Sequence, residues 1–241
     1  MALSRFSFAL LAAGAFAGAA SAEIVTRMPT DEKVVALTFD ACEAGKVAHL
    51  DHGVADWLIA RKVPFTVFMG GRFARDNAAD VKMLSALPFV EIENHSWSHR
   101  DDMRKLSDAG VIYEVVRAAW QVGIMTGRRT QFFRFPGGNT NAHTTALVEA
   151  LGYKIVHWRW PEGDPDKHVS AKGMIRQTLA MTKPGEVLIF HINGRGVHTA
   201  EAIPDVVEGL EKLGYRFVLL HDYLTEKPDA PVAMRPTASV P

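Results

Sequence analysis

The sequence is poor in cysteine and has no excess of charge of either sign. Cys42 is the only cysteine in 241 residues, so no internal disulfide can form and the fold must be stabilised by packing. Basic and acidic residues both number 27 and no basic run occurs, which gives no indication of nucleic-acid binding. No internal repeat or low-complexity block precedes the C-terminal tail. What remains is a globular chain whose 48% hydrophobic residues are ample for a core.

The N-terminus carries an apolar run from Phe6 to Ala20, preceded by the positive charge of Arg5. A comfortable bilayer span needs about 20 residues, so this run is short for a permanent anchor, which is the alternative interpretation. Ala20-Ser21-Ala22 offers the small residues that a signal peptidase accepts. We therefore expect a periplasmic or secreted protein with no stable membrane span after processing. The expected organisation is a signal peptide at residues 1–22, one domain at 23–226 and a loose tail at 227–241.

Short apolar runs alternate with segments whose apolar residues have helical spacing. The predicted strands are residues 34–39, 64–69, 89–93, 132–135, 154–158, 187–190 and 216–220. The predicted helices are residues 46–62, 77–87, 107–126, 141–151, 170–181 and 199–213. Such alternation is typical of an α/β fold with a parallel sheet covered by helices. A closed or nearly closed barrel fits the pattern, and a doubly wound open sheet is the alternative.

Polar or aromatic side chains follow five of the predicted strands, at the point where each strand ends. They are Asp40 after the first strand, His95 and His99 after the third, Arg134 and Pro136 at the end of the fourth, residues 158–166 after the fifth and His191 after the sixth. In parallel α/β folds the carboxyl ends of the strands share one face, and that face carries the functional site. We expect these side chains to form one site.

His95 and His99 are the candidate metal ligands. Four residues apart, they would share a face on a helical turn and can also converge in a tight loop. Neutral imidazole suits zinc, iron, cobalt and nickel. The alternative is two loop histidines that never meet, but their place at a strand end favours a metal site. A catalytic metal needs three protein ligands and an open position, so a further ligand is required.

The other polar residues indicate acid–base chemistry. Asp40 is a candidate base for an attacking water, or a helix cap. Arg134 can pair with Asp40, or pack its stem on the flanking phenylalanines. His191 is a candidate general acid, or a buried histidine bonded to the backbone. Asp164 and Asp166 can orient His191 and raise its pKa, or form a plain turn.

Candidate substrate contacts lie beside these groups. Pro136 and Gly137 follow Arg134, and a glycine allows close approach of the backbone to a ligand. Trp158 and Trp160 flank Arg159, and the apolar faces of sugar rings pack on aromatic side chains. One of the two tryptophans serves equally well as a core residue.

Five segments resemble, in order and spacing, the motifs of the polysaccharide deacetylases, the NodB-type enzymes of carbohydrate esterase family 4. They are Thr38-Phe39-Asp40, His95-Ser96-Trp97-Ser98-His99, Arg134-Phe135-Pro136-Gly137-Gly138, Asp164-Pro165-Asp166 and Leu188-Ile189-Phe190-His191. The agreement extends over about residues 34–220. It implies a distorted (β/α)7 barrel that hydrolyses N-acetyl, or sometimes O-acetyl, groups of an amino-sugar polysaccharide.

The resemblance also implies a cofactor and a role for each residue. A divalent metal, usually zinc and sometimes cobalt or nickel, would polarise the acetyl carbonyl and activate water. His95 and His99 would bind this metal. The catalytic residues would be Asp40 as the base, Arg134 as its partner, His191 as the acid, and Asp164 or Asp166 behind His191.

One position departs from the family pattern. Family members have two consecutive aspartates at the end of the first strand, and the second binds the metal. Here that position is Ala41, which has no ligand atom. Glu43 or Asp40 is the favoured replacement, Cys42 ranks below them as a small buried side chain, and water is a further possibility.

A polar loop, residues 192–199, follows His191. Asn193, Arg195 and His198 are candidate substrate contacts, and Arg195 suggests an anionic substrate. The structural alternative is a rigid loop in which Thr199 caps the next helix.

Three functions compete at this point. The first is a metal-dependent deacetylase acting on an acetylated polysaccharide or amino-sugar oligomer. The second is a C–N hydrolase for a small amide or imide. The third is a carbohydrate-binding relative without catalysis, which Ala41 keeps open; the retained base, acid and histidine pair argue against it.

Overall fold

The computed structural model describes residues 23–43 and 45–225, which alternate between strands and helices. The strands are β1 (Ile24–Val25), β2 (Val34–Ala41), β3 (Phe65–Met69), β4 (Val90–Asn94), β5 (Phe132–Phe133), β6 (Lys154–Val156), β7 (Glu186–His191) and β8 (Arg216–Val218). The α-helices are α1 (His52–Arg61), α2 (Gly71–Asp76), α3 (Ala78–Ser85), α4 (Asp108–Thr126), α5 (Ala142–Ala150), α6 (Ala171–Met181), α7 (Thr199–Lys212) and α8 (His221–Leu224). Two short 3₁₀ turns, Met103–Lys105 and Pro136–Gly138, complete the list. The predicted signal peptide and the predicted tail lie outside the described residues.

All named strands pair in parallel and form one curved sheet. Its order is β1-β6-β5-β4-β3-β2-β7, and β8 also pairs with β2. β8 pairs with the first residues of β2 and β3 pairs with its last residues. Beyond β1, a bridge from Arg27 to Glu186 brings the other edge of the sheet to β7. The sheet is therefore a nearly closed barrel, and the open doubly wound alternative is wrong.

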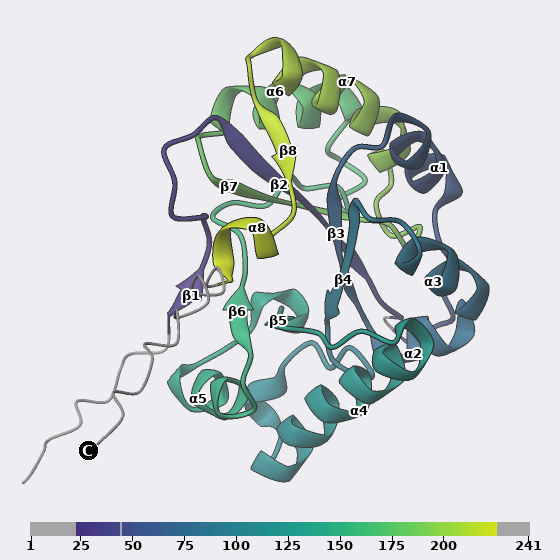
Figure 1. The fold of residues 1–241 in the computed structure, drawn as a ribbon, viewed down its shortest axis with the longest axis vertical. Helices are drawn as coiled ribbons and strands as arrows, with labels where there is room; N and C mark the ends of the chain where they lie inside the picture. The colour runs from purple at the N-terminus through teal and green to yellow at the C-terminus, as the bar shows by residue number, and fades with distance from the viewer. Residues whose placement is uncertain (1–22, 44, 226–241) are drawn as a thin grey trace, which may run out of the picture.

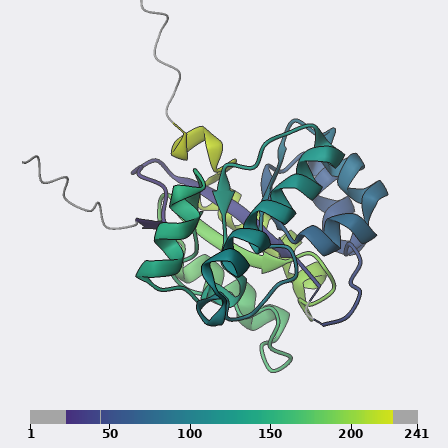
Figure 2. The ribbon, with the colours of Figure 1, turned by 90° about the horizontal axis from the view of Figure 1, so that it is seen from below.

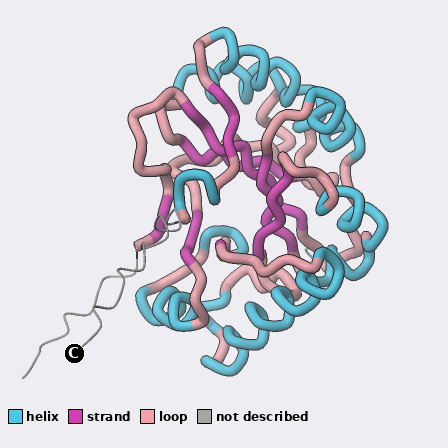
Figure 3. Tube along the Cα trace, in the orientation of Figure 1, coloured by secondary structure: helices cyan, strands magenta, loops and turns pink. Residues whose placement is uncertain are grey.

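The helices form an outer layer around most of this barrel, as Figures 1 and 3 show. Figure 2, turned by 90°, shows α4 and α5 (teal) lying over the strands. Among the described residues, no helix covers the side at β1. None of the helices in the described part of the chain is long and apolar enough to cross a membrane.

β2 shows how the sequence divides the core into two layers. Val35, Leu37, Phe39 and Ala41 belong to the cluster that packs between the sheet and the helices. Val34 and Ala36 face the other way, into a second cluster together with Phe68 and Leu220. Because side chains alternate along a strand, Thr38 and Asp40 share this inner face. The apolar interior of the barrel thus ends in polar groups at the carboxyl end of β2.

Two predicted helices differ from the observed ones. The helix predicted at residues 46–62 begins at His52, because Asp51 caps it by accepting hydrogen bonds from the N–H groups of Gly53 and Val54. The helix predicted at residues 77–87 is α3, which ends two residues earlier, and α2 was not predicted; the two helices meet at Asn77. The Asn77 side chain donates to the carbonyls of Phe73 and Ala48, which stabilises the break.

Other differences concern the ends of elements. β1 and α8 are too short to give a periodic signal and were not predicted. Several predicted strands lose residues at their carboxyl ends, where the chain turns into the site loops. Thr199, expected to cap α7, is instead its first residue, and His198 precedes it as the N-cap.

Close packing between α2 and the loop after β4 gives a testable prediction. A Cβ at Gly71 would lie 2.4 Å from Cε3 of Trp97 and 3.0 Å from Cα of Ala118. We expect Gly71→Ala to lower the free energy of unfolding by about 1–3 kcal/mol, measured by urea denaturation, because the indole must move. Gly123→Ala is the matched control. Its nearest neighbour would be 3.6 Å away, so an alanine inside α4 should raise stability by about 0.5–1 kcal/mol. Equal effects at the two positions would contradict the packing argument.

Candidate active site

A cavity of about 380 Å³ opens at the carboxyl ends of the strands. Its walls come from segments far apart in the sequence. They include Asp40, His99, Gly137, Trp158, Asp164, His191 and Arg195. The structure therefore brings together residues from all five sequence motifs, as the strand-end pattern predicts.

The two histidines lie on a tight loop, not on a helix. Ser96 and His99 have positive φ angles of 65° and 50°, which turn the chain back on itself. The imidazole rings consequently meet, with centroids 5.1 Å apart. Glu114 of α4 holds the loop by accepting hydrogen bonds from the backbone and hydroxyl of Ser98, at 2.8 and 2.6 Å. Left-handed backbone is costly for residues other than glycine, so this anchoring compensates for strain in the loop.

His95 is oriented with a free nitrogen facing Asp40. Its Nδ1 lies 2.9 Å from the carbonyl oxygen of Arg134, which can only accept, so Nδ1 carries the hydrogen. Nε2 then carries a lone pair, is buried without a hydrogen-bond partner, and lies 3.4 Å from Oδ2 of Asp40. Burial lowers the pKa of His95 to about 3, so the ring is neutral at physiological pH. A lone pair and a carboxylate oxygen thus face each other with no hydrogen between them.

The donors around this point fit a divalent metal. Ligand atoms of Cys42, His95 and His99 lie within 4.8 Å of one another, and all three residues are buried. Nδ1 of His99 is a second buried nitrogen that makes no hydrogen bond, although Oδ1 of the exposed Asp101 lies 3.1 Å from it. Two imidazoles and a sulfur are ligands that zinc accepts. The unsatisfied nitrogens are the observation that supports a cation here, because buried polar atoms are normally paired.

Asp40 and Arg134 form a fully buried ion pair. Nη1 of Arg134 donates to Oδ1 of Asp40 at 2.9 Å, and its Nε donates to the carbonyl of Val156. The guanidinium carbon also lies 3.9 Å from the centroid of the Phe68 ring. Burial alone would raise the pKa of Asp40, but His95, Arg134 and His191 outweigh it and lower the pKa to about 2. Asp40 is therefore ionised at physiological pH.

On the other side of the cavity, Asp164 orients His191. Its Oδ1 lies 3.0 Å from Nδ1 of His191, and its Oδ2 accepts from the His191 backbone N–H at 2.6 Å and from the Thr199 hydroxyl at 2.8 Å. Since a carboxylate only accepts, Nδ1 carries the hydrogen and Nε2 remains available. Asp166 does not reach His191. It lies exposed in the turn and accepts from the backbone of His168.

Four other predicted site residues lie apart from the cavity wall. Glu43 is absent from the His–Cys cluster, and its pKa is raised by burial and by neighbouring Asp76. Asn193 is buried, and its amide donates to the carbonyl of Cys42 at 2.6 Å. Trp160 packs against the outer apolar cluster. Pro136 is buried beneath Gly137, which does line the cavity.

Two buried residues near the cavity were not singled out from the sequence. Glu162 lines the cavity, accepts from the Ile189 N–H at 3.0 Å and has one oxygen without a partner. Burial raises the pKa of Glu162 well above its ordinary value. His157 stacks on Trp158 and accepts from the Phe135 N–H. Their place after β6, like that of Trp158, was the available signal.

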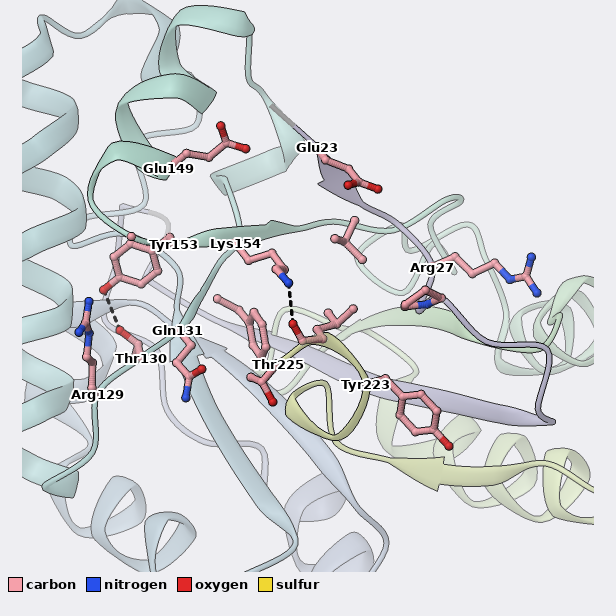
Figure 4. A pocket seen from close by; sticks show the side chains of 15 residues that line it. Glu23, Arg27, Arg129, Thr130, Gln131, Glu149, Tyr153, Lys154, Tyr223 and Thr225 are labelled. Carbon is pink, nitrogen blue, oxygen red and sulfur yellow. Dashed lines mark hydrogen bonds between the residues drawn. The ribbon is translucent and has the colours of Figure 1, made fainter. Parts of the chain in front are cut away.

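A larger pocket of about 1050 Å³ lies at the opposite end of the barrel (Figure 4). It is lined by residues at the starts of β5 and β6 and by α8. Two pairs of its polar groups bond to each other or to the backbone, since Lys154 donates to the carbonyl of Leu224 and Tyr153 bonds with Thr130. Within the described residues no cluster of metal-ligating side chains lies there. The chemistry is therefore concentrated at the carboxyl end of the strands.

The chain belongs to the polysaccharide deacetylase family, whose sequence model matches residues 27–156. It is 30% identical over 206 residues to the peptidoglycan-N-acetylmuramic acid deacetylase PdaA of Bacillus subtilis, covering 82% of this chain and 74% of that protein. It is 24% identical to a bifunctional xylanase/deacetylase of Pseudobutyrivibrio xylanivorans, with 82% of this chain matched but only 31% of the longer protein. The family predicted from the five motifs is confirmed.

Solved structures agree on the fold. The Bc1960 peptidoglycan N-acetylglucosamine deacetylase superimposes with a TM-score of 0.75 at 25% identity, covering 83% of this chain and 92% of that one. BA3943, a family 4 pseudoenzyme from Bacillus anthracis, superimposes with a TM-score of 0.74 at 19% identity, covering 86% and 71%. Because BA3943 is only 19% identical to this chain, its similarity is evidence for the fold alone. The predicted NodB-type (β/α)7 barrel is confirmed.

The buried imidazole of His157 predicts a specific pH dependence. Burial lowers the pKa of His157 from 6.5 to about 4, so the neutral ring is favoured in the folded state. The stabilisation is complete above the unfolded pKa of 6.5 and is lost as pH falls through 4, by up to about 3 kcal/mol. We expect His157→Gln to lose less stability than the wild type between pH 7 and 4, in urea unfolding with a chelator present. Exposed His168→Gln should follow the wild type, and parallel curves for all three proteins would refute the assignment.

Proposed function

We propose that this protein is a metal-dependent deacetylase that removes N-acetyl groups from an amino-sugar polysaccharide. The observation that carries the proposal is the pairing on the two sides of one cavity, Asp40 with Arg134 and His191 with Asp164. Amide hydrolysis needs a base for the attacking water and an acid for the leaving amine. Family membership supports the same reaction.

Asp40 would accept the proton of the attacking water. Arg134 holds it ionised and fixes its orientation, while Oδ2 remains free of hydrogen bonds toward the histidine pair. With a pKa near 2, however, Asp40 is a weak base. The water that it deprotonates must therefore be made more acidic by its surroundings.

His95 and His99 would hold a divalent cation for this purpose, with zinc the first expectation and cobalt or nickel the alternatives. Such a cation supplies Lewis acidity, which polarises the acetyl carbonyl and lowers the pKa of an attacking water. The fixed tautomer of His95 supports the assignment, because its lone pair already points toward the proposed site.

His191 would donate the proton to the departing amine from Nε2. Asp164 fixes the ring through Nδ1, and the Thr199 hydroxyl and the His191 backbone N–H hold Asp164 in turn. The ring is therefore held at Nδ1 while it donates the proton from Nε2. Asp166, in its exposed turn, has no part in this step.

Peptidoglycan is the substrate that we favour. The cavity of about 380 Å³ lies within the usual range of ~300–1,000 Å³ for small-ligand sites. Trp158 offers an aromatic wall to a sugar ring, and Arg195 offers a positive charge on the same rim. PdaA is named for its action on N-acetylmuramic acid, a sugar with a carboxylate, and Bc1960 for its action on N-acetylglucosamine. A signal peptide at residues 1–22 would deliver the enzyme to a polymer outside the cytoplasmic membrane.

A carbohydrate-binding protein without catalysis is the second candidate. Ala41, at the position of the family's metal-binding aspartate, favours it. The oriented acid and base weigh against it, because binding alone does not require a histidine fixed by a buried carboxylate.

The first test is acetate release from acetylated glycan with zinc supplied. We expect Asp40→Asn to lower the rate by about 100- to 10,000-fold, the usual contribution of a general base. His95→Ala should also reduce bound metal from about one ion per chain toward zero, measured by elemental analysis. Asp56→Asn, an exposed carboxylate on α1, is the control and should behave as the wild type. A wild-type protein that binds glycan but releases no acetate would favour the second candidate.

The second test concerns Arg195 and the charge of the substrate. A hydrogen bond to a charged group contributes about 1.5–3 kcal/mol, so Arg195→Gln should lower kcat/KM on muramic-acid residues by about 10- to 100-fold. Activity on glucosamine residues, which carry no carboxylate, should change much less. An equal loss on both sugars would remove Arg195 as the residue that selects an anion.

A further inference from the structure

We propose that Cys42, as a thiolate, is the third protein ligand of the metal site. The inference rests on the proposed function, because it concerns the same cation. It replaces the order of preference derived from the sequence, which placed Glu43 and Asp40 above Cys42. The position where the family has its carboxylate ligand is Ala41, so the sulfur comes from the neighbouring residue.

The first observation is the direction in which the side chains point at the end of β2. Ala41 is fully buried among the residues that face the helices, so its side chain points away from the site. Asp40 faces the barrel interior, and Cys42 follows two residues later with its sulfur near the histidine nitrogens. Residues two apart in an extended chain lie on the same side. A donor at position 42 therefore reaches the site that Asp40 faces.

The second observation is that histidine nitrogens in the cluster with Cys42 make no hydrogen bonds. Nε2 of His95 is fully buried and has no hydrogen-bond partner. Nδ1 of His99 is buried and makes no hydrogen bond, and Oδ1 of the exposed Asp101 lies 3.1 Å from it. The Cys42 side chain is 99% buried and is the remaining member of the three-residue donor cluster. A lone cysteine would indicate nothing, but here its sulfur completes a set of donors that otherwise lacks a partner.

The surroundings of Cys42 hold the sulfur in place. Asn193 donates to the Cys42 carbonyl at 2.6 Å and lies 3.5 Å from its sulfur. Gly70 packs against the same residue, and a Cβ there would lie 3.4 Å from Cα of Cys42. Hydrogen bonds to a ligand orient it and tune the metal. Asn193, expected from the sequence to touch substrate, is therefore a positioning residue for the ligand.

The competing ligands are less suited. Glu43 is not a member of the donor cluster, although its Oε1 is buried without a hydrogen-bond partner, and burial and neighbouring Asp76 raise the pKa of its carboxyl group. One oxygen of Asp40 is already bonded to Arg134, and the carboxylate is needed as the base. Two imidazoles and a thiolate form a softer donor set than two imidazoles and a carboxylate, so it favours zinc and cobalt over magnesium or manganese.

Cobalt substitution tests the sulfur directly. Full-length protein stripped with a chelator and loaded with one equivalent of Co²⁺ should show a sulfur-to-cobalt charge-transfer band in the near ultraviolet. The chain has one cysteine, so the band can come only from Cys42. We expect Cys42→Ser to lose it, and Cys42→Asp to bind cobalt without it. Stoichiometric cobalt binding by the wild type without this band would overturn the inference.

Zinc affinity gives an independent measure. Loss of an outer partner typically costs about 10- to 100-fold in metal affinity, which is our expectation for Asn193→Ala. Cys42→Ser should cost more than that, and Glu43→Gln should leave the Kd for zinc unchanged. An unchanged Kd in Cys42→Ser, or a large loss in Glu43→Gln, would assign the third ligand to another residue. Circular dichroism and thermal unfolding of the metal-free variants check that each one folds.

The ligand assignment and the proposed function can fail separately. If Cys42→Ser keeps both its zinc affinity and its acetate release, the thiolate ligand is wrong and the deacetylase stands. If wild-type protein binds cobalt through sulfur but releases no acetate from any acetylated glycan, the ligand set stands and the activity is wrong.

Discussion

The buried ion pair between Arg134 and Asp40 is the interaction on which the site depends. Arg134 makes three separate interactions through its side chain, its backbone carbonyl and its backbone N–H. Its guanidinium binds Asp40, its carbonyl fixes the tautomer of His95, and its N–H donates to the carbonyl of Asn94. A guanidinium removed from water is costly unless its partner is present, and breaking such a pair typically costs about 3–5 kcal/mol. The base and the proposed metal ligand are therefore set by one residue, and neither can shift without the other.

Unsatisfied polar atoms are unevenly distributed between the two ends of the barrel. At the amino end, the buried carboxylate of Glu91 accepts from Thr66, Leu220 and His221, so its capacity is used in closing the sheet. At the carboxyl end, the atoms without a hydrogen-bond partner belong to Glu43, His95, His99, Arg134, Trp160 and Glu162. Buried polar groups left unpaired reduce stability. Their concentration at one rim indicates that they are paired by groups that bind there.

The sequence predicted the alternation of elements and the polar strand ends because both follow from local rules. Period-2 and period-3.6 patterns identify most elements, and parallel strands place Asp40, His95 and His191 on one face whatever the loops do. The helix that starts after Asn77 was predicted, but α2 was not, because its six residues are too few for a periodic signal. The break between the two helices depends on a contact with Ala48, distant in sequence. The shape of the histidine loop could not be predicted either, since its left-handed residues are not glycines.

The choice of the third ligand depends on the direction of the side chains along β2 as well as on the chemistry of the donor. Glu43 and Asp40 were favoured because carboxylates replace a carboxylate, a comparison of chemistry alone. The alternation of β2 adds geometry, since Asp40 faces inward, Ala41 faces the helices, and position 42 faces inward again. The contact between Asn193 and Cys42 could not be predicted from the sequence, because the two residues are 151 positions apart.

The electrostatics of the rim link this ligand choice to the chemistry. Arg134 keeps Asp40 ionised, but the same interaction makes it a weak base, with a pKa near 2. A weak base is effective only toward a water whose own pKa has been lowered. A thiolate donates more charge to a cation than a carboxylate does, and so reduces the acidity that the cation can confer. A Cys42 ligand would therefore lower the catalytic power of the metal and bind a soft metal more tightly. The positive charge of Arg195 at the rim would recover part of the lost rate by stabilising negative charge on the substrate.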